Sequence, residues 1–241
     1  MKILFIAPIP PPITGHSLVS DLLYKDLQKN NQVEIVNLSK TGVTVGVGFI
    51  NRILEIFSIL KEINSKKKNV DKIYFTISES FFGNFKDLFI YLICYSNLSK
   101  MYIHLHGGSI KRLLWDKNKF IYFVNKLFIK KLGGVIISGN SHMQIFDTFV
   151  PNEKIHIVPN FALDYLHLHK SKIFEKFENT IPLNVLYISG MKKQKGYEAL
   201  LNAYLKLNSK DQQRVKIDFA GNFESDALKK YLLNKLNLMV I

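Results

Sequence analysis

A loop rich in lysine and glycine follows one short apolar run in the second half of the chain. In residues 184–207, NVLYISGMKKQKGYEALLNAYLKL, the run ends at Ser189 and Gly190, and Lys195 and Gly196 stand where the next helix begins. Helix-terminal amides supply directional donors and a lysine ammonium supplies a point charge, a combination that suits a diphosphate. The pattern also fits a solvated turn that is merely rich in lysine. A Walker A loop is excluded by the spacing and by the missing Gly-Lys-Ser/Thr sequence.

Two histidines alternate along a second apolar run, MYIHLHGGS. His104 and His106 are two residues apart, so an extended strand places them on the same side. Ligands of open α/β sheets collect at the carboxyl ends of strands, so we expect His106 to contact substrate and His104 to be structural. A metal site needs further ligands, and no nearby Cys, Asp or Glu supplies them. We therefore expect neither a metal nor another cofactor.

The first loop, PIPPPITGHSLVSDL, follows the opening apolar run. Gly15 allows backbone to approach a bound group, and Ser17 begins a helix whose free amides suit an anion. An ordinary strand-to-helix turn that needs a glycine gives the same pattern. A nicotinamide site is disfavoured, because no G-x-G-x-x-G sequence occurs here.

A basic amphipathic segment, KRLLWDKNKFIYFVNKLFIKKL, covers residues 111–132. It has seven basic residues and one acidic residue, interleaved with apolar ones. Such a helix can lie on an anionic bilayer, and we expect Trp115, Lys126, Lys130 and Lys131 to make that contact. A core-packed helix with a solvated lysine face is the open alternative.

Composition sets the class of protein and of partner. The chain has 241 residues, 47% of them hydrophobic and 22% charged, which is typical of a globular protein. Its formal charge of +14 favours an anionic partner. Nucleic acid is a weak candidate, since the lysines are dispersed and no nucleic-acid-binding module occurs. The single cysteine, Cys94, excludes a disulfide framework and is expected to be buried and inert. We expect a cytoplasmic location, because the apolar run from Ile3 to Ala7 is too short for the core of a signal peptide. No uncharged run approaches the ~20 residues of a membrane span, so we expect any membrane contact to be peripheral, at the inner face of the cell membrane.

Short apolar runs alternate with amphipathic segments, as in βαβ units around a parallel sheet. The pattern predicts strands at residues 2–8, 33–38, 72–77, 101–106, 134–138 and 154–158. It predicts helices between them at residues 17–29, 50–65, 85–98, 113–132 and 141–149. A second α/β pattern has strands at 184–189 and 215–220, helices at 197–207 and 225–236, and a possible strand start at LMVI, residues 238–241. The predicted organisation is therefore a domain at 1–163, a connector at 164–182 and a second domain at 183–241.

Six segments in order resemble the family 4 glycosyltransferases. They are MKILFIAPIPPPITGHS at the start, HLHGG at 104–108, VIISGNS at 135–141, IHIVPNF at 155–161, LYISGMKKQKGYEALLNAYLKL at 186–207 and IDFAGNFES at 217–225. The resemblance implies a GT-B fold of two Rossmann-like domains, and sugar transfer from a nucleotide-sugar donor with retention of configuration and no required metal. It further implies that Gly15 approaches the donor diphosphate or the acceptor, that His106 hydrogen-bonds the donor sugar, and that Lys195 stabilises the leaving diphosphate.

The resemblance also implies a function and an incomplete second domain. We expect transfer to a saccharide or polyprenyl-linked acceptor in bacterial surface-polysaccharide biosynthesis. Thr14 and Gly190 stand where the family often has glycine and arginine. The family's acidic motif, which holds the donor's sugar and ribose, is expected beyond residue 241, so the first domain is expected to be complete and the second partial. A catalytically inactive remnant or a binding module is the alternative.

Overall fold

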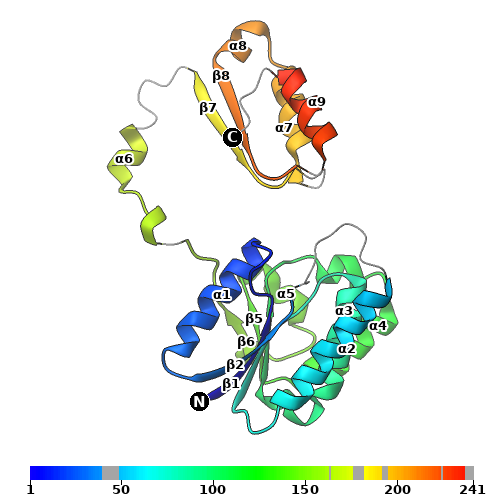
Figure 1. Cartoon of the computed structure of the whole chain (residues 1–241). Helices are drawn as coiled ribbons and strands as arrows, with labels where there is room; N and C mark the ends of the chain where they lie inside the picture. The colour runs from blue at the N-terminus through cyan, green and yellow to red at the C-terminus, as the bar shows by residue number, and fades with distance from the viewer. Residues whose placement is uncertain (40–48, 163, 176–181, 192–194, 224, 237–241) are drawn as a thin grey trace. The chain divides into compact units, whose positions relative to one another are not determined.

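The structure is a computed structural model that describes residues 1–39, 49–162, 164–175, 182–191, 195–223 and 225–236. Contacts divide the chain into two compact units, Met1–Phe161 and Ala162–Ile241. Each unit has its own parallel sheet, and the two are described separately (Figure 1).

The first unit is built on a six-stranded sheet in which every pairing is parallel. The strand order is β2-β1-β3-β4-β5-β6. The strands are β1 (Lys2–Ala7), β2 (Gln32–Asn37), β3 (Lys72–Thr76), β4 (Met101–Leu105), β5 (Gly134–Ile137) and β6 (Ile155–Ile157). All six lie within the predicted strands or within one residue of them. The predicted α/β class is confirmed.

Helices cover the two faces of this sheet unequally. The α-helices are α1 (Gly15–Gln28), α2 (Phe49–Lys66), α3 (Phe81–Ile93), α4 (Lys119–Ile129) and α5 (Met143–Phe146). Short 3-10 helices are η1 (Tyr95–Lys100), η3 (Asn140–His142) and η4 (Asn152–Lys154), and η2 (Lys111–Trp115) is a π-helix. Figure 1 shows α1 on one face and α2, α3 and α4 on the other. Right-handed crossovers require this, because the chain reverses its direction across the sheet after β2.

The alternation of side chains along β1 explains the two apolar cores. Leu4 and Ile6 pack in the core that contains buried side chains of α2, α3 and α4. Phe5 and Ala7 point to the other face, toward α1, where Phe5 stacks on Tyr74 with ring centroids 4.6 Å apart. Because both faces are covered at this strand, it reads as an unbroken apolar run.

A buried pair of asparagines joins α3 to α4. The side-chain amide of Asn84 donates to the Asn125 carbonyl oxygen at 3.0 Å, and Asn125 donates back at 2.9 Å. Each residue is almost fully buried. The reciprocal bonds satisfy two polar groups that would otherwise be costly inside an apolar core.

Cys94 caps the carboxyl end of α3 and is fully buried. Burial raises the pKa of its thiol to about 11, against a smaller opposing effect of Lys67. The prediction of a buried thiol is confirmed, and the raised pKa keeps it protonated at neutral pH.

The second unit has a two-stranded parallel sheet. Its strands are β7 (Leu183–Ile188) and β8 (Val215–Ala220), and its helices are α7 (Tyr197–Leu205), α8 (Ser209–Gln213) and α9 (Asp226–Leu236). A small core contains the buried side chains of Met191, Tyr197, Leu201, Ile217 and Phe219. Two short helices, η5 (Asp164–Leu166) and α6 (Lys170–Glu175), lie in the predicted connector. The predicted strand start at residues 238–241 lies outside the described residues.

Three predicted helices differ from the structure. The helix predicted at 85–98 begins earlier and is divided, since α3 covers residues 81–93 and the 3-10 helix η1 covers residues 95–100. The predicted helix at 113–132 is wrong as one element, because η2 ends at Trp115 and α4 begins only at Lys119. Asn118 caps α4, and its side-chain oxygen accepts from the Ile121 amide at 3.0 Å. The predicted helix at 141–149 is shorter, since only residues 140–146 are helical.

Candidate functional site

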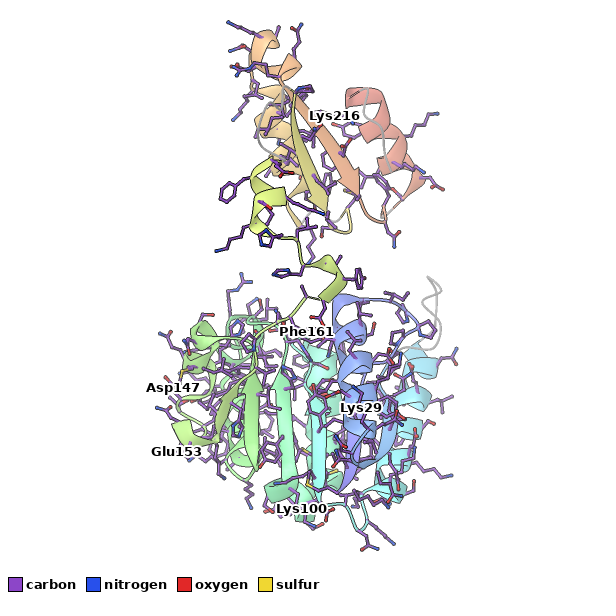
Figure 2. All side chains as sticks on the ribbon, turned by 90° about the vertical axis from the view of Figure 1, so that its left-hand side faces the viewer. Lys29, Lys100, Asp147, Glu153, Phe161 and Lys216 are labelled. Atoms are coloured by element: carbon purple, nitrogen blue, oxygen red, sulfur yellow. The ribbon has the colours of Figure 1, made fainter. Side chains whose placement is uncertain are left out.

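The carboxyl ends of the strands define one edge of the first unit. Figure 2 shows Lys100, which precedes β4, and Phe161, which follows β6, at opposite ends of the sheet. His106 directly follows β4, so it lies at the Phe161 end. In parallel sheets this is the edge at which loops form ligand sites.

Three imidazole rings lie in a row at this edge, with His104 and His106 stacked and His16 tilted by 46° against His106. His104, in β4, and His106 have ring centroids 3.9 Å apart, and His106 and His16 of α1 have centroids 4.3 Å apart. At the inner end, Nδ1 of His104 shares a 2.6 Å hydrogen bond with the hydroxyl of Tyr74 in β3. We call His16, His106 and His104 the histidine column. The sequence predicts two of these residues from their alternation, and the structure adds His16.

Burial keeps the histidine column uncharged. It lowers the pKa of His106 to about 3, with smaller contributions from His104 and His16, and that of His104 to about 4, with a smaller contribution from His16. The pKa of His16 is lowered by burial and then by Lys86. A neutral imidazole has one donor and one acceptor nitrogen, so it can bind a hydroxyl group without a net charge.

The outer histidines have unused hydrogen-bonding atoms. Nε2 of His106 and Nε2 of His16 are both buried and have no hydrogen-bond partner among the residues that the structure describes. Buried polar atoms are normally paired, so unpaired ones in this position indicate a place for a ligand or an ordered water. By contrast, the His104 ring is held by Tyr74, which agrees with the predicted structural role.

Glu79, which follows β3, fixes the loop after His106. Its Oε1 accepts from the backbone amides of Ser109 and Ile110, at 2.5 and 3.0 Å. A Cβ at Gly107 would collide with the same carboxylate. A side chain at position 107 would therefore displace this hydrogen-bonded carboxylate, and sequence reasoning missed the glutamate.

The second glycine, Gly108, lies close to the side chain of His142. A Cβ at Gly108 would come within 2.5 Å of Nε2 of His142, whose Nδ1 shares a 3.0 Å hydrogen bond with Ser138. Both glycines thus let the loop after β4 pass close to side chains from neighbouring loops. Their presence can therefore be explained by packing, without a role in ligand binding.

The first loop differs from its prediction in one respect. Ser17 does not present a free amide, because its backbone nitrogen donates to Oγ1 of Thr14 at 3.0 Å, and its own hydroxyl accepts from the Thr14 amide at 2.9 Å. This capping box pairs one of the α1 amides that we expected to face an anion. Among the residues that the structure describes, no atom lies within 4 Å of the position that a Cβ at Gly15 would take. Packing against these residues does not require this glycine.

The lysine loop lies in the second unit, before α7. Lys195 is exposed, and its carbonyl oxygen accepts from the Tyr187 hydroxyl at 3.0 Å. Gly196 is the residue before α7 and has φ +84°, a left-handed conformation that favours glycine. Lys192 and Lys193 lie outside the described residues.

The other two predicted residues of this loop hold the end of β7 against β8. The Ser189 amide donates to the Ala220 carbonyl oxygen at 3.1 Å, and a Cβ at Gly221 would collide with the Ser189 backbone. Gly190 follows, and among the described residues a Cβ there would meet only the Asn222 carbonyl oxygen, at 3.9 Å. Ser189, Gly190, Lys195 and Gly196 all belong to the segment between β7 and α7.

The basic segment 111–132 requires one correction. Trp115 is only 3% exposed and packs edge-to-face on Phe149 at 4.7 Å between centroids, so the predicted contact of its ring with a membrane is wrong. Lys130 and Lys131 are exposed, and Lys126 is half-buried with its amine 5.5 Å from the Tyr122 ring centroid. No helix in the described residues is both long and apolar enough to cross a bilayer.

Comparison with known proteins establishes the fold. No protein-family model matches the sequence, and neither does any curated protein. Among solved structures, sucrose-phosphate synthase from Thermosynechococcus elongatus matches all of this chain and 70% of its own, with a TM-score of 0.60 and 11% identity. MurG from Acinetobacter baumannii matches all of this chain and 67% of its own, with a TM-score of 0.51 and 14% identity. Both are glycosyltransferases of GT-B type, so the predicted GT-B fold is confirmed.

Proposed function

We propose that the chain is a glycosyltransferase that moves a sugar from a nucleotide-sugar donor to a saccharide or polyprenyl-linked acceptor, with retention, in bacterial surface-polysaccharide biosynthesis. The observation that carries the proposal is His106, a neutral imidazole with an unpaired nitrogen at the carboxyl ends of the strands. It stands in a fold that known glycosyltransferases share. Such an imidazole suits the hydroxyl groups of a sugar.

In the proposed reaction the bond between the sugar's anomeric carbon and the diphosphate oxygen breaks. A bond from the same carbon to the acceptor oxygen forms on the same face, and the acceptor's proton passes to the departing diphosphate. His106 binds a sugar hydroxyl, and Gly15 leaves space for the donor diphosphate or the acceptor. The Lys195 ammonium stabilises the charge that develops on the diphosphate. Ser189, Gly190 and Gly196 shape the loop that carries this lysine, and the chemistry needs no metal.

Peripheral contact with an anionic membrane belongs to the same proposal. Lys126, Lys130 and Lys131 lie in or directly after α4, and segment 119–132 has no acidic residue. A lipid-linked acceptor would be met at such a surface.

The test is release of nucleoside diphosphate from a panel of nucleotide-sugars in the presence of a bacterial lipid and saccharide extract. We expect Lys195→Ala to lower the release about 100-fold, because the leaving group loses its charge partner. Lys210→Ala is the matched control, since Lys210 is exposed in the same unit and lies in α8. It is expected to leave release unchanged.

Two other results would count against the proposal, one against transfer and one against the role of Lys195. Saturable binding of a nucleotide-sugar with no release from any donor would favour the alternative, an inactive binding module. Equal diphosphate release from the wild type and from Lys195→Ala would show that Lys195 does not stabilise the leaving group.

A further inference from the structure

The outward side of α3 carries a row of exposed aromatic rings. Phe81, Phe82, Phe85 and Phe89 are 51%, 75%, 55% and 40% exposed. Spacings of four residues place three of them on one side of the helix, and the fourth lies beside them. The rings pair edge-to-face, with centroids 5.6 Å apart in the first pair and 5.0 Å apart in the second. Four phenylalanines on one short helix form a patch rather than the scattered apolar residues of an ordinary surface.

The neighbouring helices continue this patch. Phe120, Phe123 and Leu127 of α4 are at least half exposed, and Leu54 and Phe57 of α2 are more than 60% exposed. Helices α2, α3 and α4 form one layer on the same face of the sheet (Figure 1), and the buried asparagine pair joins α3 to α4. We use the term aromatic face for the four phenylalanines of α3 together with Phe120 and Phe123 of α4.

The charge beside the aromatic face is entirely positive on α4. Residues 119–132 include Lys119, Lys126, Lys130 and Lys131 and no acidic residue. The acidic residue of α3, Asp87, is fully buried, where its Oδ2 accepts from a backbone amide. The amine of Lys131 lies 4.4 Å from the centroid of the Tyr95 ring at the end of this face. A lysine can lay its aliphatic stem along such apolar surface and keep its ammonium in the polar layer above it.

The exposed rings and the neighbouring lysines together favour one binding partner for this face over another. Self-association through the aromatic face would bring the lysines of two copies together, and like charges in contact disfavour it. An anionic bilayer offers acyl chains to the rings and phosphates to the ammonium groups at once. We propose that the aromatic face is the surface through which the chain binds anionic lipid bilayers. The proposal deepens the peripheral location given under the proposed function and does not depend on sugar transfer.

The experiment is sedimentation of the whole chain with vesicles of phosphatidylcholine alone and of phosphatidylcholine mixed equally with phosphatidylglycerol. The wild type is expected to bind the mixed vesicles more tightly. Phe82→Ser with Phe85→Ser is expected to lower the partition coefficient roughly tenfold or more, since two large apolar groups leave the bilayer. Phe82→Leu with Phe85→Leu is expected to restore most of the binding.

A matched control and a charge variant complete the set. Phe161→Ser with Phe174→Ser removes two exposed rings outside the aromatic face and is expected to leave binding unchanged. Lys130→Gln with Lys131→Gln is expected to weaken binding to the mixed vesicles by about fivefold for each lysine, and to have little effect on phosphatidylcholine alone. Circular dichroism checks that each variant is folded.

Undiminished vesicle binding by the serine pair would overturn the proposal. A wild type that ignores vesicles but forms dimers that the serine pair separates would overturn it as well, and would assign the face to a second copy. Because vesicle binding is measured without donor sugar, absent diphosphate release with normal binding refutes the proposed function alone. Normal release with no vesicle binding refutes this inference alone.

Discussion

At the scale of single residues, neighbouring side chains of the histidine column have different roles: His104 is structural, and His106 is proposed to bind the sugar. The Tyr74 hydroxyl holds the His104 ring by a hydrogen bond, and the His106 ring stacks on it with centroids 3.9 Å apart. His106 keeps a nitrogen free, and burial keeps the ring neutral. An imidazolium in its place would attract phosphate oxygens rather than select hydroxyl groups.

Replacement of His106 tests its proposed role directly. His106→Phe is expected to lower sugar transfer about 10- to 100-fold through loss of one hydrogen bond in the transition state. His106→Gln, which retains a donor and an acceptor, is expected to recover part of that loss. His156→Gln on the exposed edge strand β6 serves as the control. Equal activity of His106→Phe and the wild type would show that the His106 ring makes no hydrogen bond that assists sugar transfer.

The low pKa of His104 predicts a loss of stability in acid. Its pKa is about 4 in the folded chain and about 6.5 when unfolded, so between these values the unfolded chain binds a proton that the folded chain does not. The free energy of unfolding therefore falls as pH drops below 6.5. The contribution of His104 reaches about 2 kcal/mol at pH 5. Urea titrations of the wild type and of His104→Gln should show a shallower pH dependence in the variant, and identical slopes would contradict the assignment.

The sequence predicts only part of this site, for a physical reason. His104 and His106 could be predicted, because the alternation of side chains along a strand is a local property and the ligand sites at the carboxyl ends of strands follow from the sheet topology. His16 and Glu79 were missed because their contacts join residues about 90 and 30 positions apart. One available signal was that His16 follows Gly15 in the loop at the same edge of the sheet.

At the scale of elements, the helices α2, α3 and α4 form a layer with a buried polar pair on its inner side and exposed apolar residues on its outer side. The asparagine pair is the polar device inside this layer. It fixes the register of α3 against α4, because any shift would leave two buried amides unpaired.

Asn125→Leu is expected to lower the free energy of unfolding by about 1 to 3 kcal/mol, since Asn84 would remain buried without its partner. Asn84→Leu with Asn125→Leu is expected to regain part of this loss, because no unpaired amide remains. Urea denaturation monitored by Trp115 fluorescence measures both. Additive losses in the double variant would argue against an interaction between the two amides.

The strand predictions are accurate to within one residue because buried parallel strands form short continuous apolar runs. The basic segment was misread because its apolar spacing continues across a break. Asn118 is a preferred N-cap residue in the middle of it, and that signal was available in the sequence. The burial of Trp115 could not be predicted, because segment 111–132 carries apolar residues on its exposed side as well as on its buried side.

At the scale of the whole molecule, the two units have separate apolar cores. Phe219 is fully buried in the core of the second unit, and none of the described residues of the first unit belongs to that core. Each unit therefore has its own source of stability.

Phe219→Ala is expected to destabilise the second unit by about 3 to 5 kcal/mol through loss of a buried ring. Hydrogen exchange followed by mass spectrometry should show faster exchange in β7 and β8. The strands of the first unit should keep their protection. Uniform loss of protection along the whole chain would mean that the two units unfold together.

The protonated thiol of Cys94 makes the chain suited to spectroscopic labelling. It is the only cysteine, and its burial withholds it from maleimide reagents while the protein is folded. A cysteine introduced at an exposed position of each unit, for example in place of Phe120 and of Lys210, would accept a dye with little background from the native thiol. Energy transfer between two such dyes would then report, in solution and with a donor sugar added, the spacing of the two units.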